Sequence, residues 1–282
     1  GRTMKGGSDV SDRAAGQYGS VGKIAFADQL RGVAALMVVA AHFFLSFWRQ
    51  SGAVAAAIAA PLASQENGIS GWAFWDYVNP GPFGVALFFL ISGFVIPFSL
   101  GRYSGVAFLL ARAIRIYPTY IACLAISTLT ILFNASWWNG AVHFTPMQWL
   151  ANALLLNDLT AAPSIDLVNW TLVVEMRFYL VMAVIAGAIR TSNVSVVFTV
   201  AFICAAFNAA WHFELLGDIK KTHYVTLAQI AVSAQCIIFM LIGTLVQFHC
   251  RGSLRNDRAM TLIALMALLF LGTWRFGVWA EH

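Results

Sequence analysis

The sequence predicts an all-α, polytopic helical membrane protein, and three observations support this fold class. Of the 282 residues, 60% are hydrophobic. Only 10% are charged, whereas a soluble domain carries about 25% charged residues. Apolar stretches long enough to cross a bilayer recur along the whole chain. The protein is therefore expected to be embedded in the membrane and not merely anchored to it by one segment.

The chain is predicted to consist of a short tail and one membrane domain. Residues 1–24 are polar and rich in Gly and Ser, which indicates a flexible cytoplasmic tail. Residues 25–282 are expected to form a single membrane-embedded domain with seven spans. These spans are expected at about residues 27–48, 82–100, 116–133, 170–189, 194–211, 225–248 and 259–280.

The number of spans depends on the short apolar piece 147–156. We expect that it does not cross, since a spanning helix needs about 20 residues. In that case twelve of the 17 Lys and Arg residues lie on the side of the N-terminus, which is a strong positive-inside bias. If the piece crossed, Arg190 and the basic cluster 251–258 would move to the other side. We therefore expect a cytoplasmic N-terminus and a C-terminus outside.

Two classes of site are disfavoured by the composition. The net charge of +5 is explained by orientation in the membrane, and the basic residues show no aromatic interleaving, so no nucleic-acid partner is expected. The four cysteines are far apart, and no pair has metal-ligand spacing. Neither a metal site nor a disulfide framework is therefore expected.

The first span places two ionisable side chains on one helix face. Arg31 and His42 are eleven residues apart. At about 100° and 1.5 Å per residue, this spacing returns them to nearly the same face, roughly 16 Å apart along the axis. Ionisable groups inside a membrane cost free energy unless they are paired or used. This face is predicted to line a functional cavity, with a packing role for His42 as the alternative.

Small and basic residues mark the next two spans. Ser92 and Gly93 lie within the second span, where small residues let helices approach closely or let backbone line a cavity. Arg112 and Arg115 are neighbours on one helix face at the inner mouth of the third span, and Pro118 allows a break after them. Paired guanidinium groups suit phosphate, while contacts with lipid headgroups are the alternative.

The fourth span contains two charged residues of opposite sign. Glu175 and Arg177 are expected about two turns below the outer surface, with Glu175 at a depth similar to that of His42. An intramembrane carboxylate is a functional candidate, although Glu175 could also pair with Arg177.

The predicted outer loops carry several aromatic rings that could stack on sugars. An interfacial aromatic belt is the more common reason for such rings. They are Trp72, Phe74, Trp75, Tyr77, Trp137, Trp138 and Trp149.

Four stretches recur in one order and at specific spacings. They are LRGVAALMVVAAH at 30–42, FGVALFFLISGFVI at 83–96, FLLARAIRIYP at 108–118 and NWTLVVEMRFYL at 169–180. Together they resemble the acyltransferase-3 family of integral membrane O-acyltransferases, which modify bacterial surface glycans and related acceptors. Each stretch alone is mostly apolar, so the specificity comes from all four in combination.

The resemblance implies a donor site and a catalytic histidine. Arg31 and His42 match an arginine and a histidine in the family, and that histidine is regarded as essential for acyl transfer. Arg112 and Arg115 match a basic pair thought to hold acyl-CoA. The face between Arg31 and His42 would then carry the extended arm of the donor.

The resemblance also covers the remaining candidates. Ser92 and Gly93 match a serine–glycine motif, which we group with the donor-binding residues. Glu175 matches the glutamate of the family's tryptophan-led motif. Arg177 departs from the family pattern, because a neutral residue is common at this position.

The reaction that the resemblance implies is acyl transfer across the bacterial inner membrane. An acyl group, with acetyl as the first expectation, would pass from cytoplasmic acyl-CoA to a hydroxyl of an extracytoplasmic glycan or lipid-linked sugar. His42 would act as general base or form a transient acyl-histidine, and Glu175 would orient the imidazole or the acceptor. Family members usually have about ten spans, so a chain with seven is expected to be a fragment.

Two other function classes compete with this one. A proton-coupled transporter or exporter would use His42, Glu175 and Arg177 as a relay, and it would show substrate flux without any need for acyl-CoA. A non-catalytic membrane scaffold would tolerate loss of these ionisable residues.

Overall fold

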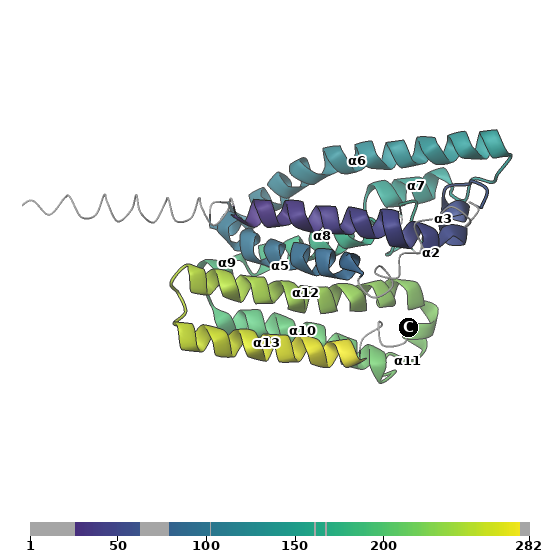
Figure 1. Cartoon of the computed structure of the whole chain (residues 1–282). Coiled ribbons are helices and arrows are strands. Elements are labelled where there is room, and N and C mark those ends of the chain that lie inside the picture. Colours follow the sequence, from purple (N-terminus) through teal and green to yellow (C-terminus); the bar gives the residue numbers. More distant parts are fainter. Residues whose placement is uncertain (1–25, 63–78, 102, 161, 167, 277–282) are drawn as a thin grey trace, which may run out of the picture.

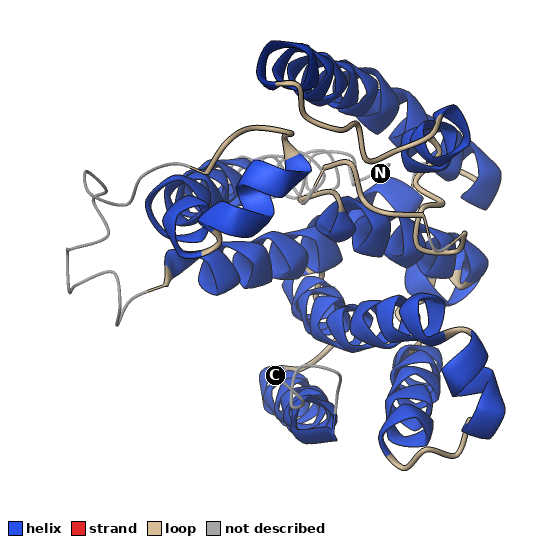
Figure 2. Cartoon of the chain, turned by 90° about the vertical axis from the view of Figure 1, so that its right-hand side faces the viewer, coloured by secondary structure: helices blue, strands red, loops and turns tan. Residues whose placement is uncertain are grey.

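The computed structural model describes residues 26–62, 79–101, 103–160, 162–166 and 168–276. Within these ranges every regular element is a helix, so the all-α class is confirmed (Figures 1 and 2). The predicted tail 1–24, the predicted outer-loop aromatics at 72–77 and the end of the last predicted span lie outside the described residues.

The helices follow one another along the chain. The first helix, Phe26–Arg49, contains the π-helical segment η1, His42–Ser46, and ends in α2, Phe47–Arg49. The others are α3 Ser51–Ala57, α5 Pro80–Leu100, α6 Gly105–Trp138, α7 Pro146–Ala153, α8 Trp170–Val184, α9 Ala186–Arg190, α10 Val194–His212, α11 Gly217–Thr222, α12 Tyr224–Cys250 and α13 Asn256–Phe276.

Six helices among the described residues are long and apolar enough to cross a membrane, against the seven spans predicted. The difference lies at 170–189, where α8 has only 15 residues. Ile185, with φ −92° and ψ 16°, separates α8 from α9, so the predicted span is divided into two shorter helices. The eight-residue helix α7 covers most of the piece 147–156 and is far too short to span, as predicted.

The third predicted span is part of a longer helix. α6 is continuous over 34 residues and includes Pro118, at which the sequence allowed a break. A proline removes one intrahelical hydrogen bond, but this helix continues through it. Arg112 and Arg115 therefore belong to α6 itself and share one rigid element with the rest of the span.

Three connections meet at one end of the helices, which we call the basic end. Arg190 at the end of α9 donates from Nε to the Leu100 carbonyl at 2.9 Å and from Nη2 to the Tyr103 carbonyl at 2.8 Å. Ser192 Oγ donates to Ser253 Oγ at 3.0 Å. The connections after α5, α9 and α12 thus lie together, and the first helix also begins at this end (Figure 1). This agrees with the predicted grouping of Arg190 with the cluster 251–258.

The bundle is held together around α12, which packs against α5, α10 and α13. A Cβ on Gly93 would lie 1.8 Å from the Met240 carbonyl oxygen, and a Cβ on Gly243 would lie 2.2 Å from that of Leu90. Thr244 Oγ1 donates to the Gly93 carbonyl at 3.1 Å. Small residues therefore allow α5 and α12 to cross in backbone contact.

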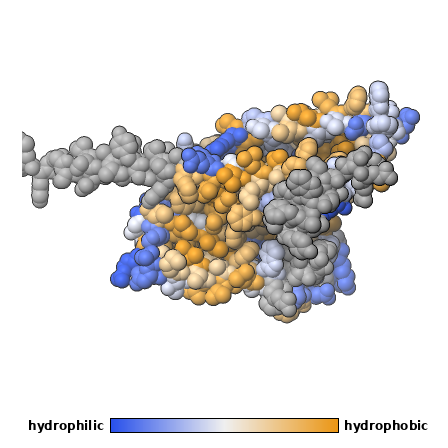
Figure 3. All heavy atoms as spheres, in the orientation of Figure 1, coloured by the Kyte–Doolittle hydropathy of each residue, from blue (hydrophilic) through white to orange (hydrophobic). Residues whose placement is uncertain are grey.

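The surface has the distribution expected of a membrane protein. Figure 3 shows a broad apolar surface over the middle of the long helices, with hydrophilic residues gathered toward both ends. Large apolar side chains of the long helices, such as Leu36, Leu129 and Leu268, are exposed. In lipid such exposure carries no penalty, so the finding supports several membrane-spanning helices.

Candidate active site

Glu175 of α8 is the centre of a group of polar side chains between α5, α6 and α8. Ser92 Oγ donates to Glu175 Oε1 at 3.0 Å, and the Tyr179 hydroxyl donates to the same oxygen at 2.5 Å. Two donors therefore hold Oε1, while Oε2 makes no hydrogen bond to a described residue.

Arg112 of α6 continues this group toward the basic end. Its Nη2 donates to Ser99 Oγ, and its guanidinium lies 5.4 Å from the ring centre of Phe108 and 5.6 Å from that of Tyr179. Arg112 is only 9% exposed. Ser92, Glu175, Tyr179, Arg112 and Ser99 thus form a connected series of polar contacts, which we call the polar chain.

The three predicted donor-binding arginines gather at Arg112. Arg31, Arg115 and the carboxylate of Glu175 all lie near enough to Arg112 for their charges to act on its guanidinium. Arg31 is half-buried and lies 3.4 Å from Asp28, while Arg115 is exposed. Among the described residues, no carboxylate lies within ion-pair distance of Arg112. Arg112 is thus a buried cation without a described ion-pair partner, and a bound anion would offset its charge.

His42 lies apart from the polar chain. It begins the π-helical segment, in which the Phe47 N–H bonds to the His42 carbonyl, and its side chain is exposed. Its neighbour Ala41 meets the start of α5, because a Cβ on Gly81 would lie 2.9 Å from Ala41 Cβ. Glu175, in contrast, contacts Ser92. Ser92 lies eleven residues after Gly81, which is about 16 Å further along α5.

The prediction that His42 and Glu175 lie at similar depth is therefore wrong. The reason is that α8 does not begin at the surface: its first residue, Trp170, packs edge-on against Phe89, well inside α5, at 6.4 Å between ring centres. The connection before α8 is folded into the protein around the fully buried Asn152. Its Nδ2 donates to the Pro163 carbonyl at 2.9 Å, and its Oδ1 accepts from the Ile165 N–H at 3.1 Å.

Arg177 is not the partner of Glu175. It points to α12, where Nη1 donates to the Gln229 carbonyl at 3.1 Å and to Ser233 Oγ at 2.6 Å. Its Nη2 forms an ion pair with the buried Asp158. The two charges of α8 therefore have separate surroundings.

Sequence reasoning missed Tyr179 and Asp158. Tyr179 follows Glu175 by four residues, a spacing that places both on one face of a helix and could have indicated the contact. Asp158 stands in the apolar run that follows α7, where an isolated carboxylate signals a buried partner.

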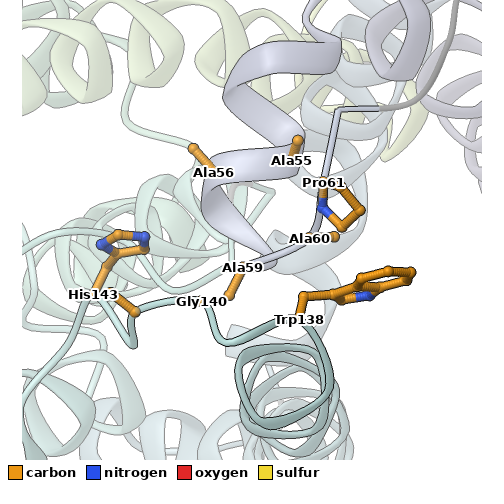
Figure 4. A pocket seen from close by; sticks show the side chains of 9 residues that line it. Ala55, Ala56, Ala59, Ala60, Pro61, Trp138, Gly140 and His143 are labelled. Atoms are coloured by element: carbon orange, nitrogen blue, oxygen red, sulfur yellow. The ribbon is translucent and has the colours of Figure 1, made fainter.

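The described cavities lie away from the arginines. One, of about 310 Å³, lies between α3 and the α6–α7 connection and is lined by alanines together with Pro61, Trp138, Gly140 and His143 (Figure 4). A second, of about 260 Å³, lies between α10 and α13. Among the described residues, no group of three or more His, Cys, Asp and Glu side chains could hold a metal ion.

Comparison with known proteins gives one match. The acyltransferase-3 family model, described as an acyltransferase domain, matches residues 24–282. This confirms the resemblance drawn from the four sequence stretches and extends it over the later helices. No curated protein and no solved structure matches the chain.

Proposed function

The chain belongs to the acyltransferase-3 family and is a membrane acyltransferase, and we propose that it is an acyl-CoA-dependent O-acyltransferase. The acyl group, acetyl in the first instance, passes from cytoplasmic acyl-CoA to a hydroxyl of an extracytoplasmic glycan or lipid-linked sugar. The membrane is the bacterial inner membrane, and the basic end faces the cytoplasm.

The gathering of three arginines from two helices carries this proposal. Arg112 is buried, and no carboxylate of the described residues lies within ion-pair distance of it; Arg115 and Arg31, the latter beside Asp28, add positive charge nearby. CoA presents several phosphate oxygens to such a cluster, and guanidinium groups bind phosphate through two parallel hydrogen bonds. The arginines would thus hold the nucleotide end of the donor at the basic end.

The donor's arm would then extend along the first helix toward His42. Arg31 and His42 lie on one side of this helix, roughly 16 Å apart along its axis. His42 would accept the proton of the acceptor hydroxyl while its oxygen attacks the thioester carbonyl; the C–S bond then breaks, and the CoA thiolate leaves and takes up that proton. In the alternative, His42 first displaces CoA to form an acyl-histidine, which then passes the acyl group to the hydroxyl. The π-helical segment that begins at His42 fits a functional position, because π-turns occur frequently at such sites.

Glu175 takes a different role from the one expected. It lies beside Arg112 and not beside His42, so it would act on the donor's arm. Its second oxygen, Oε2, has no hydrogen bond to a described residue, and it would accept one from an amide N–H of that arm and so align the thioester with His42. Ser92 belongs to the same donor site through its bond to Glu175, whereas Gly93 contributes through the close approach of α5 and α12.

The acceptor would approach at the end opposite the basic end. The cavity beside Trp138 and His143 lies there, and Trp138 is 55% exposed. Aromatic rings offer a flat apolar surface to a sugar face, and the imidazole offers a hydrogen-bonding group. This cavity could hold part of a glycan chain while another unit reaches His42.

The deciding experiment compares wild type with His42→Ala. The protein is expressed in a bacterial host, and surface glycans are analysed by mass spectrometry for added acetyl groups. In parallel, purified protein in nanodiscs is titrated with acetyl-CoA. We expect acetylation by wild type, its loss in His42→Ala, and unchanged acetyl-CoA binding in both. Full acetylation by His42→Ala would reject the mechanism, and acetylation without acyl-CoA binding would reject the donor.

The transporter alternative has less support. Its relay needs His42, Glu175 and Arg177 in succession, but no described hydrogen bond or ion pair links any two of them. Substrate flux without acyl-CoA would restore it.

A further inference from the structure

We propose that Tyr179 is a positioning residue of the donor site: it fixes Oε1 of Glu175, leaves Oε2 open to the donor, and supports Arg112 with its ring. This inference deepens the proposed function and rests on it only for the nature of the ligand. The contacts of Tyr179 stand independently of that function.

The first step concerns the hydroxyl of Tyr179. It donates to Glu175 Oε1 at 2.5 Å, and Ser92 Oγ donates to the same oxygen at 3.0 Å. Because both donors meet one oxygen, rotation of the carboxylate would break two hydrogen bonds at once. Tyr179 is 3% exposed, so water cannot easily replace its hydroxyl. The carboxylate is thus held at Oε1, and Oε2 is the oxygen left without a hydrogen bond to a described residue.

The second step concerns the ring. Arg112 lies over the Tyr179 ring at 5.6 Å, and Phe108 packs edge-on against that ring at 5.8 Å with planes at 82°. An aromatic face attracts a guanidinium most strongly where water is excluded. The ring therefore gives the buried cation a favourable contact that does not neutralise its charge.

The third step concerns what Tyr179 prevents. Among the described residues, no ion pair joins Glu175 to Arg112, although one side chain contacts both. In a direct ion pair the Glu175 carboxylate and the Arg112 guanidinium would neutralise each other, and neither would remain for a ligand. By contacting the carboxylate with its hydroxyl and the guanidinium with its ring, Tyr179 keeps the two charges near each other and separately available.

The test uses Tyr179→Phe, with Tyr120→Phe as a matched control. Tyr120 is also buried, and its hydroxyl donates to the Asn152 carbonyl at 2.6 Å, away from the polar chain. Both variants lose one buried hydroxyl hydrogen bond. Only Tyr179→Phe should affect Glu175, so a general loss of stability can be separated from a loss of position.

The first readout needs no acyl transfer. Dicyclohexylcarbodiimide, an apolar reagent for carboxyl groups, is applied to the protein in nanodiscs, and labelling of Glu175 is followed by mass spectrometry, with Glu175→Gln as the blank. We expect Tyr179→Phe to change the labelling rate of Glu175 several-fold, since one of its two donors is gone. Tyr120→Phe should label at the wild-type rate. Equal rates in all three proteins would overturn the proposal.

The second readout is the acetyl transfer itself. Tyr179→Phe should lower kcat roughly fivefold to tenfold with KM for acetyl-CoA little changed, because the ring still supports Arg112. Tyr179→Leu removes the ring as well and should also raise this KM. A wild-type kcat in Tyr179→Phe would overturn the proposal. If wild type transferred no acetyl group, the labelling rates alone would still decide the role of Tyr179.

Discussion

Glu175 and Arg177 stand two residues apart on α8, yet their surroundings are opposite. Arg177 meets an ion-pair partner, Asp158, and two further oxygen acceptors on α12. Among the described residues, the hydrogen-bond partners of Glu175 are the neutral hydroxyls of Ser92 and Tyr179, and both bind its Oε1. Two residues on a helix differ by about 200° in direction, so the two side chains face different helices.

This difference separates a structural charge from a functional one. A charge in the membrane that is matched by an opposite charge contributes to packing. The pair of Arg177 and Asp158 does so by holding the segment before α8 against α12. A charge that has neutral partners and an oxygen without a hydrogen bond retains its capacity to bind or react. Mutations on the Arg177 side of α8 should therefore change the stability of the protein, and mutations on the Glu175 side should change its activity.

The largest effect is expected on the Arg177 side. Asp158→Asn leaves a largely buried guanidinium without its counter-charge, which should lower the free energy of unfolding by about 3 kcal/mol. Thermal unfolding in detergent would measure the loss. Combining it with Arg177→Gln should recover much of the stability, because no unpaired charge remains. Wild-type stability in the single variant would remove the structural assignment.

Glu175→Gln should lower activity strongly and change stability little. The amide oxygen can still accept from Ser92 and Tyr179, but Oε2 is replaced by an N–H donor and the charge is lost. Hydrogen bonds to charged groups contribute about 1.5–3 kcal/mol, so kcat/KM for acetyl-CoA should fall roughly 10-fold to 100-fold. The unfolding free energy should change by less than about 1 kcal/mol. A destabilised but active variant would contradict the comparison.

A smaller change is expected from Arg112→Lys. Lysine keeps the positive charge but not the planar fork that binds phosphate through two hydrogen bonds, so KM for acetyl-CoA should rise about tenfold. Arg258→Lys is the matched control, because Arg258 is an exposed residue at the basic end. Similar KM values for the two variants would indicate that the cluster acts only through its net charge.

The smallest effect belongs to Arg115→Gln. Arg115 is exposed, and screened surface charges contribute little. KM for acetyl-CoA should rise by no more than about threefold at low salt, and the difference should fade as ionic strength increases. A salt-independent loss larger than that of Arg112→Lys would mean that Arg115 makes the direct phosphate contact.

Local sequence determined most of the helices, because a spanning helix satisfies its own hydrogen bonds and needs only a sufficient apolar length. The contact between Glu175 and Tyr179 could likewise be predicted from local sequence, because residues four apart share one helix face. The failures arose where contacts are distant along the chain. Asn152 organises the segment before α8 and so sets the depth of Trp170, and neither residue reveals this by itself.

Only the tertiary structure decided the partners of the charges. Ser92 reaches Glu175 across 83 positions, and Asp158 reaches Arg177 across 19. Hydropathy measures whether a residue can enter the membrane, but it carries no information on which neighbour it meets there. That choice depends on helix rotation and on where small residues such as Gly93 allow close approach. Packing between helices, and not the composition of any one of them, therefore decides which charge is bound and which remains available.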